Sequence, residues 1–160
     1  MEEGRNYIRI LRESLEKKER ILHNLLDMTR QQEEYLAGSE FELDVFEEML
    51  DVKNGMIEEL NSVDDGFETV YERIREYLQS HQKELAEPIR EMQNRVREIT
   101  SLSVSLQALE ERNRKKLEGV FASKQQEIKK FRQSSQMVNN YYQTMSGAGS
   151  YQPSFLDKKK

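Results

Sequence analysis

The chain has 160 residues and a formal net charge of −5; 36% of its residues are hydrophobic and 34% are charged. This mixture is too polar for a thick globular core but suits slim helices that each bury one stripe. There is no cysteine, which excludes disulfides and thiolate metal sites. No apolar run approaches the length of a membrane span, and the N-terminus lacks the pattern of a signal peptide. We therefore expect a cytoplasmic protein without membrane insertion.

An apolar residue recurs every three to four positions across residues 7–142, and Pro88 is the one proline in that stretch. This spacing predicts amphipathic helix, because side chains three and four apart share a face. We expect an all-α protein, an antiparallel helical bundle of three to four long amphipathic helices with a flexible C-terminal tail. The bundle should span residues 1–142, with helices at about 6–36, 40–61, 66–86 and 88–140, and the tail residues 143–160.

The first predicted helix, residues 6–36, should be terminated by residues 37–39, since Gly38 tolerates the left-handed conformation that closes many helices. Its stripe is thinner in the second half, because polar residues occupy apolar positions of the repeat. These are Lys18, Thr29 and Gln32, among the apolar residues Ile8, Leu11, Leu15, Leu22, Leu25 and Leu36.

The second predicted helix, residues 40–61, starts at a capping box formed by Ser39 and Glu42. Its stripe contains Lys53 among apolar residues: Leu43, Phe46, Leu50, Ile57 and Leu60. Residues 63–66, which include two aspartates and Gly66, predict a short connection to a third helix.

The third and fourth predicted helices, residues 66–86 and 88–140, keep one register across Pro88. Proline removes a helical hydrogen bond and clashes with the carbonyl of Glu84, so we expect a break or a strong bend near residues 81–88. Asn113 interrupts the stripe of the last helix. A lone buried polar residue can fix register. We expect Asn113 to reach a partner, and Lys53 to lay its methylenes on the stripe with its ammonium in water.

Charge is unevenly distributed along the chain: residues 1–80 hold 21 acids and 10 bases, a net charge of −11. The acids concentrate at residues 40–76 and a basic excess lies at residues 112–132. We interpret this as an acidic helix packing beside a basic one. The alternative is a phosphate-binding strip, but the basic residues fall all round the helix with few aromatic partners, so nucleic acid is not an expected partner.

Catalytic and metal-binding patterns are missing from the sequence. A di-metal bundle site needs a Glu-x-x-His motif, but the residues three positions before His23 and His81 are Arg20 and Leu78. There is no phosphate-binding glycine loop and no nucleophile elbow. We expect no enzyme activity, no metal and no cofactor.

The C-terminal third carries more apolar and aromatic area than one partner helix can cover. Such surfaces mark partner sites, and packing in the core or in a homodimer is the structural alternative. The candidate protein-binding residues are Phe121, Ile128, Phe131, Met137, Tyr141 and Tyr142. In the tail, Phe155 and Leu156 form an isolated apolar pair that is typical of either a docking peptide or an ordinary chain end.

Several of these features together resemble the FlgN-type flagellar export chaperones. They are the sequence LAGS at residues 36–39, the acidic second helix with Lys53 in its stripe, LEERN at residues 109–113, the pair Tyr141 and Tyr142, and FLDKKK at residues 155–160. The likeness covers nearly the whole chain, and the FliT-type chaperones are the second choice.

The resemblance implies a cytosolic chaperone of flagellar type III secretion. Such proteins keep hook-associated proteins soluble and deliver them to the export apparatus, and they bind cargo through their C-terminal region. A disordered amphipathic cargo segment would complete the unfinished apolar stripe. The alternative function is a structural coiled-coil scaffold that self-associates through its helical stripes.

Overall fold

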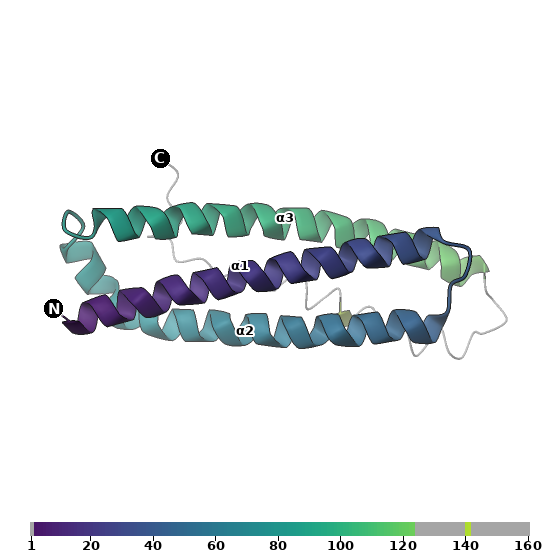
Figure 1. Cartoon of the computed structure of the whole chain (residues 1–160), viewed down its shortest axis with the longest axis horizontal. Coiled ribbons are helices and arrows are strands. Elements are labelled where there is room, and N and C mark those ends of the chain that lie inside the picture. Colours follow the sequence, from purple (N-terminus) through teal and green to yellow (C-terminus); the bar gives the residue numbers. More distant parts are fainter. Residues whose placement is uncertain (1, 124–139, 142–160) are drawn as a thin grey trace.

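The computed structural model describes residues 2–123 and 140–141, and these form an all-α, antiparallel bundle (Figure 1). Its long helices are α1 (Glu2–Ala37), α2 (Leu43–Ser80) and α3 (Ala86–Ser123). At a rise of 1.5 Å per residue each is about 55 Å long. The predicted fold class is confirmed. Within the described residues, no helix has the length and apolar character needed to cross a membrane.

Helix α1 is the centre of the bundle, because α2 and α3 both pack along it, whereas the backbones of α2 and α3 hardly approach one another. Figure 1 shows α1 running between the other two. The predicted stripe of α1 is buried at every apolar position. It belongs to one core cluster with Phe46 and Leu50 of α2 and Leu106 of α3, all 0% exposed.

The predicted break at residues 63–66 is wrong, because α2 continues through it as one helix. The apolar spacing explains the continuity, since Leu60, Phe67 and Tyr71 stay on one buried face at 0%, 5% and 3% exposure. Asp64 does not cap a new helix but pairs with the buried Lys18 of α1, with 2.7 Å between Oδ1 and Nζ. Burial along the whole face outweighs the turn tendency of the local sequence.

The predicted break at residues 81–88 is present. Helix α2 ends at Ser80, and the amide of His81 donates to the carbonyl of Tyr77 at 3.1 Å. Pro88 lies in the first turn of α3, where a missing amide hydrogen removes no helical bond. The four-helix division of the sequence therefore becomes three helices here, and residues 124–139, part of the predicted last helix, lie outside the described residues, as do residues 142–160.

The start of α2 differs from the predicted capping box. The helix begins at Leu43 rather than at residue 40, and its N-cap residue Glu42 makes no side-chain capping bond. Instead the amide of Glu42 donates to the hydroxyl of Tyr35 at 2.6 Å. Helix α1 ends at Ala37, close to the predicted end, but Gly38 does not adopt the left-handed conformation.

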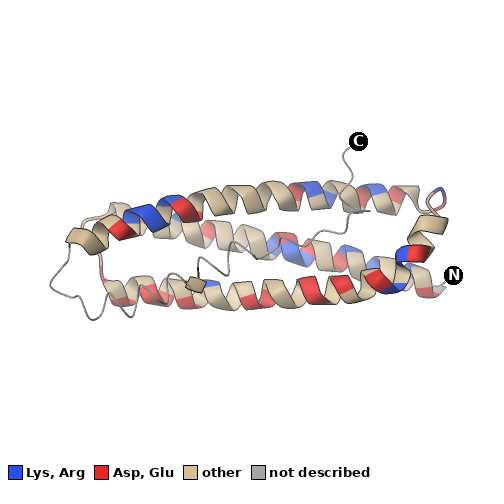
Figure 2. Ribbon diagram, turned by 180° about the vertical axis from the view of Figure 1, so that it is seen from behind, with Lys and Arg blue, Asp and Glu red and all other residues tan. Residues whose placement is uncertain are grey.

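Charge is arranged differently from the expected pairing of an acidic helix with a basic one. Figure 2 shows acidic residues spread along α2, but α2 packs on α1 rather than on α3. Helix α1 supplies both signs. Its Lys17 and Lys18 pair with Glu59 and Asp64 of α2, and its Glu33 pairs with Arg112 and Lys116 of α3.

Replacing Gly66 by alanine tests the continuity of α2. Gly66 is exposed, and a Cβ there would meet nothing within 4 Å. Because glycine within a helix is about 1 kcal/mol less favourable than alanine, Gly66→Ala should raise the free energy of unfolding by about that amount, measured by urea denaturation.

The matched control is Gly4→Ala, whose Cβ would lie 2.7 Å from the ring of Tyr77. That ring packs on His81 with ring centroids 4.2 Å apart, so it has to move, and the variant should lose about 1 kcal/mol or more. A Gly66→Ala variant no more stable than the wild type would contradict a helical Gly66.

Candidate functional site: a buried polar layer

A group of polar side chains crosses the interior of the bundle, nearer the end where α1 connects to α2 than its centre, at positions where apolar residues would be expected. We call Thr29, Gln32, Lys53, Glu110 and Asn113 the polar layer. Four of them are 0% exposed and Glu110 is 2% exposed. They come from all three helices, so their contacts tie the helices to one another.

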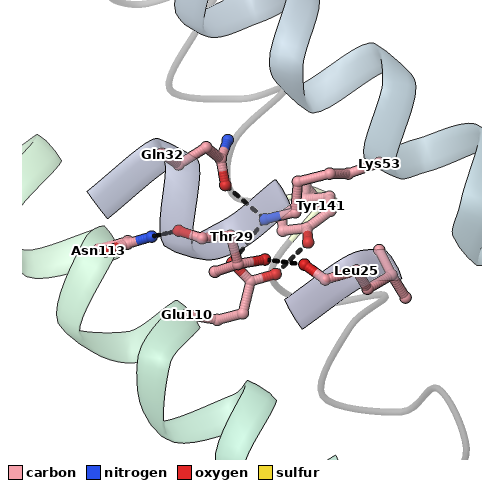
Figure 3. A network of polar contacts seen from close by, with 7 residues as sticks. All are labelled: Leu25, Thr29, Gln32, Lys53, Glu110, Asn113 and Tyr141. Atoms are coloured by element: carbon pink, nitrogen blue, oxygen red, sulfur yellow. Dashed lines mark hydrogen bonds and ion pairs between the residues drawn. The ribbon is translucent and has the colours of Figure 1, made fainter. Parts of the chain in front are cut away.

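Lys53 is the centre of the polar layer (Figure 3). Its Nζ lies 2.7 Å from Oε1 of Glu110 on α3 and donates to Oε1 of Gln32 on α1 at 2.5 Å. One ammonium group thus bridges all three helices. The prediction that Lys53 reaches water is wrong, because a carboxylate and an amide oxygen satisfy the ammonium inside the bundle.

Tyr141 completes the surroundings of Lys53 from outside the three helices. Its hydroxyl donates to Oε2 of Glu110, and Nζ of Lys53 lies 4.5 Å from the centroid of its ring. Tyr141 is only 1% exposed. Its ring therefore stacks on the cation while its hydroxyl contacts the anion of the same ion pair.

Asn113 and Thr29 connect α1 to α3 one turn away from Lys53. The side-chain amide of Asn113 donates to the carbonyl of Thr29 at 3.0 Å, and the Thr29 hydroxyl donates to the carbonyl of Leu25 at 2.6 Å. The expectation that Asn113 reaches a partner is confirmed. Within the described residues, Nε2 of Gln32 and Oδ1 of Asn113 are buried without a hydrogen-bond partner.

The polar layer has a stability cost that its geometry offsets only in one register. Burying an ion pair costs several kcal/mol per ion before pairing, and removing one partner typically costs about 3–5 kcal/mol. Sliding α2 by one turn, about 5.4 Å, would carry Lys53 out of bonding distance of Glu110 and Gln32. We interpret the layer as a device that fixes the alignment of the three helices.

Burial lowers the pKa of Lys53 to about 8, and the adjacent Glu110 carboxylate opposes that shift through its charge and its hydrogen bond. Lys53 is therefore charged at neutral pH, but less strongly basic than a lysine in water.

Only two of the six candidate protein-binding residues lie in the described part of the chain. Phe121, near the end of α3, is partly buried against the core, and Tyr141 is buried. The structure brings Tyr141 against the polar layer. Ile128, Phe131, Met137 and Tyr142 lie outside the described residues, so their role as partner contacts stays a prediction.

Glu110 is the member of the polar layer that was not predicted as an exception in the apolar stripes. A signal was present, because Leu106, Glu110, Asn113 and Leu117 follow the 4-3-4 spacing of a buried stripe. The basic residues of α3 that suggested a phosphate strip have acidic neighbours, since Arg114 contacts both Glu111 and Glu118. Within residues 2–123 and 140–141, no cluster of three or more His, Cys, Asp or Glu could hold a metal ion.

The fold and the polar layer together define a class of protein: a slender helical bundle held in register by buried charges, with an aromatic residue from its C-terminal region inserted against them. A family model described as FlgN protein matches residues 1–148, and the chain belongs to the FlgN family. This is a family of flagellar export chaperones, so the resemblance seen in the sequence is confirmed. No curated protein and no solved structure matches the chain.

Lys53→Met alone should lower the free energy of unfolding by about 3–5 kcal/mol, because it leaves Glu110 buried without its cation. The double variant Lys53→Met with Glu110→Leu removes both charges and should recover most of that loss. Urea denaturation followed by circular dichroism measures both. A double variant as unstable as the single one would contradict the importance of the uncompensated charge.

Stability should also depend on pH through Lys53. Its pKa is lower in the folded chain, about 8, than its ordinary value of 10.5, so between these values the unfolded chain binds more protons. Stability contributed by Lys53 is therefore constant below about pH 8 and rises between pH 8 and 10.5.

The measurement is the urea denaturation free energy of the wild type minus that of the double variant, at several pH values from 7 to 10.5. Subtraction removes the titration of the other lysines and tyrosines. A difference that stays flat or falls above pH 8 would show that Lys53 is not buried as described.

Proposed function

We propose that this protein is a cytosolic chaperone of flagellar type III secretion that binds hook-associated proteins, keeps them soluble and delivers them to the export apparatus. The observation that carries the proposal is the match of the FlgN family model to residues 1–148, which includes the apolar C-terminal region. Cargo that orders on binding loses conformational entropy, so binding should be of modest affinity and readily reversed.

The proposed cargo contacts are Phe121, Ile128, Phe131, Met137, Tyr141 and Tyr142. Support comes from their chemistry, since aromatic residues and methionine offer large, adaptable contact area. Phe121 is the member of this group that lies near the end of α3. An amphipathic cargo segment that lays its apolar side chains on these residues would be recognised as a helix in a groove.

The alternative, a self-associating coiled-coil scaffold, requires the helical stripes to pair between chains. In the described residues the stripes of α1, α2 and α3 are buried against one another within a single chain, which favours the chaperone. Small-angle scattering separates the two. A scaffold predicts a particle much longer than one chain, whereas the chaperone predicts a bundle about 55 Å long.

Phe131→Asp and Tyr142→Asp should each weaken binding to a co-expressed hook-associated protein at least about 30-fold, the effect of losing a central interface residue. Co-purification followed by isothermal titration calorimetry measures this. Tyr141→Asp is unsuitable, because it would place a second carboxylate beside the buried Glu110.

The matched control is Val104→Asp, which introduces the same charge at a valine of α3 that is 60% exposed. It should leave binding unchanged. Circular dichroism must show equal helicity in all variants. Full binding by both Phe131→Asp and Tyr142→Asp would sink the assignment of the cargo contacts, and the absence of any binding by the wild type would sink the proposed function.

A further inference from the structure

Tyr141 is subject to two incompatible demands. The proposed function makes it a cargo contact, yet in the structure it is 1% exposed and its hydroxyl donates to Glu110. Glu110 lies 13 residues before Ser123, the last residue of α3, so Tyr141 is placed about 20 Å back along the bundle from that end. In this position its side chain cannot contact another protein.

We propose that the Lys53–Glu110 pair and the cargo compete for Tyr141: the pair holds Tyr141 in the unloaded chain, and Tyr141 must leave the pair to contact cargo. This inference rests on the proposed function and adds its regulation. The competing states are Tyr141 inserted and Tyr141 released, and cargo binds the released state.

The contacts of Lys53 and Glu110 allow Tyr141 to leave without dismantling the polar layer. Lys53 keeps its contacts with Oε1 of Glu110 and with Gln32, because Tyr141 uses the other carboxylate oxygen, Oε2. Release exposes that oxygen and one face of the ammonium, both of which water can solvate. The Lys53–Glu110 pair thus stays in place whether Tyr141 is inserted or released.

The tyrosine hydroxyl is the group that holds the inserted state most specifically. A hydrogen bond to a charged group is among the stronger ones in a protein, and Tyr141→Phe removes it while keeping the aromatic ring for the cargo. Apparent affinity scales with the fraction of chains in the binding-competent state. Where that fraction is small in the wild type, removing the hydroxyl should raise affinity by about 3- to 10-fold.

The experiment is isothermal titration calorimetry of the full-length chain and its variants with a purified hook-associated protein. Tyr141→Phe should bind 3- to 10-fold more tightly than the wild type, although its fold loses stability. Tyr7→Phe is the matched control, because the hydroxyl of Tyr7 donates only over 3.4 Å to the exposed Glu3 of the same helix. Its affinity should equal that of the wild type.

A second variant keeps the test decisive if Tyr141→Phe fails to fold. Lys53→Met with Glu110→Leu removes both charges that hold Tyr141 without altering a proposed cargo contact, and it should also bind more tightly than the wild type. Equal or weaker binding by the folded variants, with the wild type binding normally, overturns this inference and leaves the proposed function intact. No binding by any chain, wild type included, removes the proposed function and this inference with it.

Discussion

The bundle depends on satisfying one ammonium group, that of Lys53, in a place that water does not reach. The cation is compatible with its position because Glu110 and Gln32 approach it from the two other helices. The apolar stripes around it tolerate several helix alignments, since leucines and isoleucines pack acceptably in more than one. The polar contacts of Lys53 do not tolerate such shifts, because a hydrogen bond is satisfied only within a fraction of an ångström. Fixed alignment of the three helices follows from this difference.

The central position of α1 explains how a strongly acidic helix is tolerated in so thin a protein. Helix α2 pairs with two lysines of α1, and two bases of α3, Arg112 and Lys116, pair with Glu33 of α1. The ion pair that joins α2 to α3 has the opposite polarity to their overall charges, with the lysine on α2 and the glutamate on α3. The exposed ion pairs between α1 and its two neighbours each contribute little to stability.

Membership in the FlgN family gives the polar layer a context beyond stability. A chaperone that holds an unfolded segment needs apolar area for cargo, and the same area must be protected when cargo is absent. Under the proposed function, insertion of Tyr141 beside Lys53 and Glu110 protects one large aromatic side chain in this way. Because the receptor for that side chain is polar and specific, the protected state is a defined structure rather than a nonspecific collapse of apolar residues.

The sequence by itself determined the helical class, the buried stripes and the break near Pro88, because helical periodicity and proline act within a few residues. It also marked Lys53 and Asn113 as exceptions in the stripes. The tertiary structure decided what local signals could not. The local sequence of residues 63–66 predicts a turn. Helix α2 nevertheless passes through them, because Leu60 and Phe67 are buried on either side and Asp64 pairs with Lys18 of α1. Likewise the spacing could not say that Lys53 meets Glu110 and Tyr141, 57 and 88 residues away. Pairing across such separations depends on how helices are arranged in space, which no short-range pattern encodes.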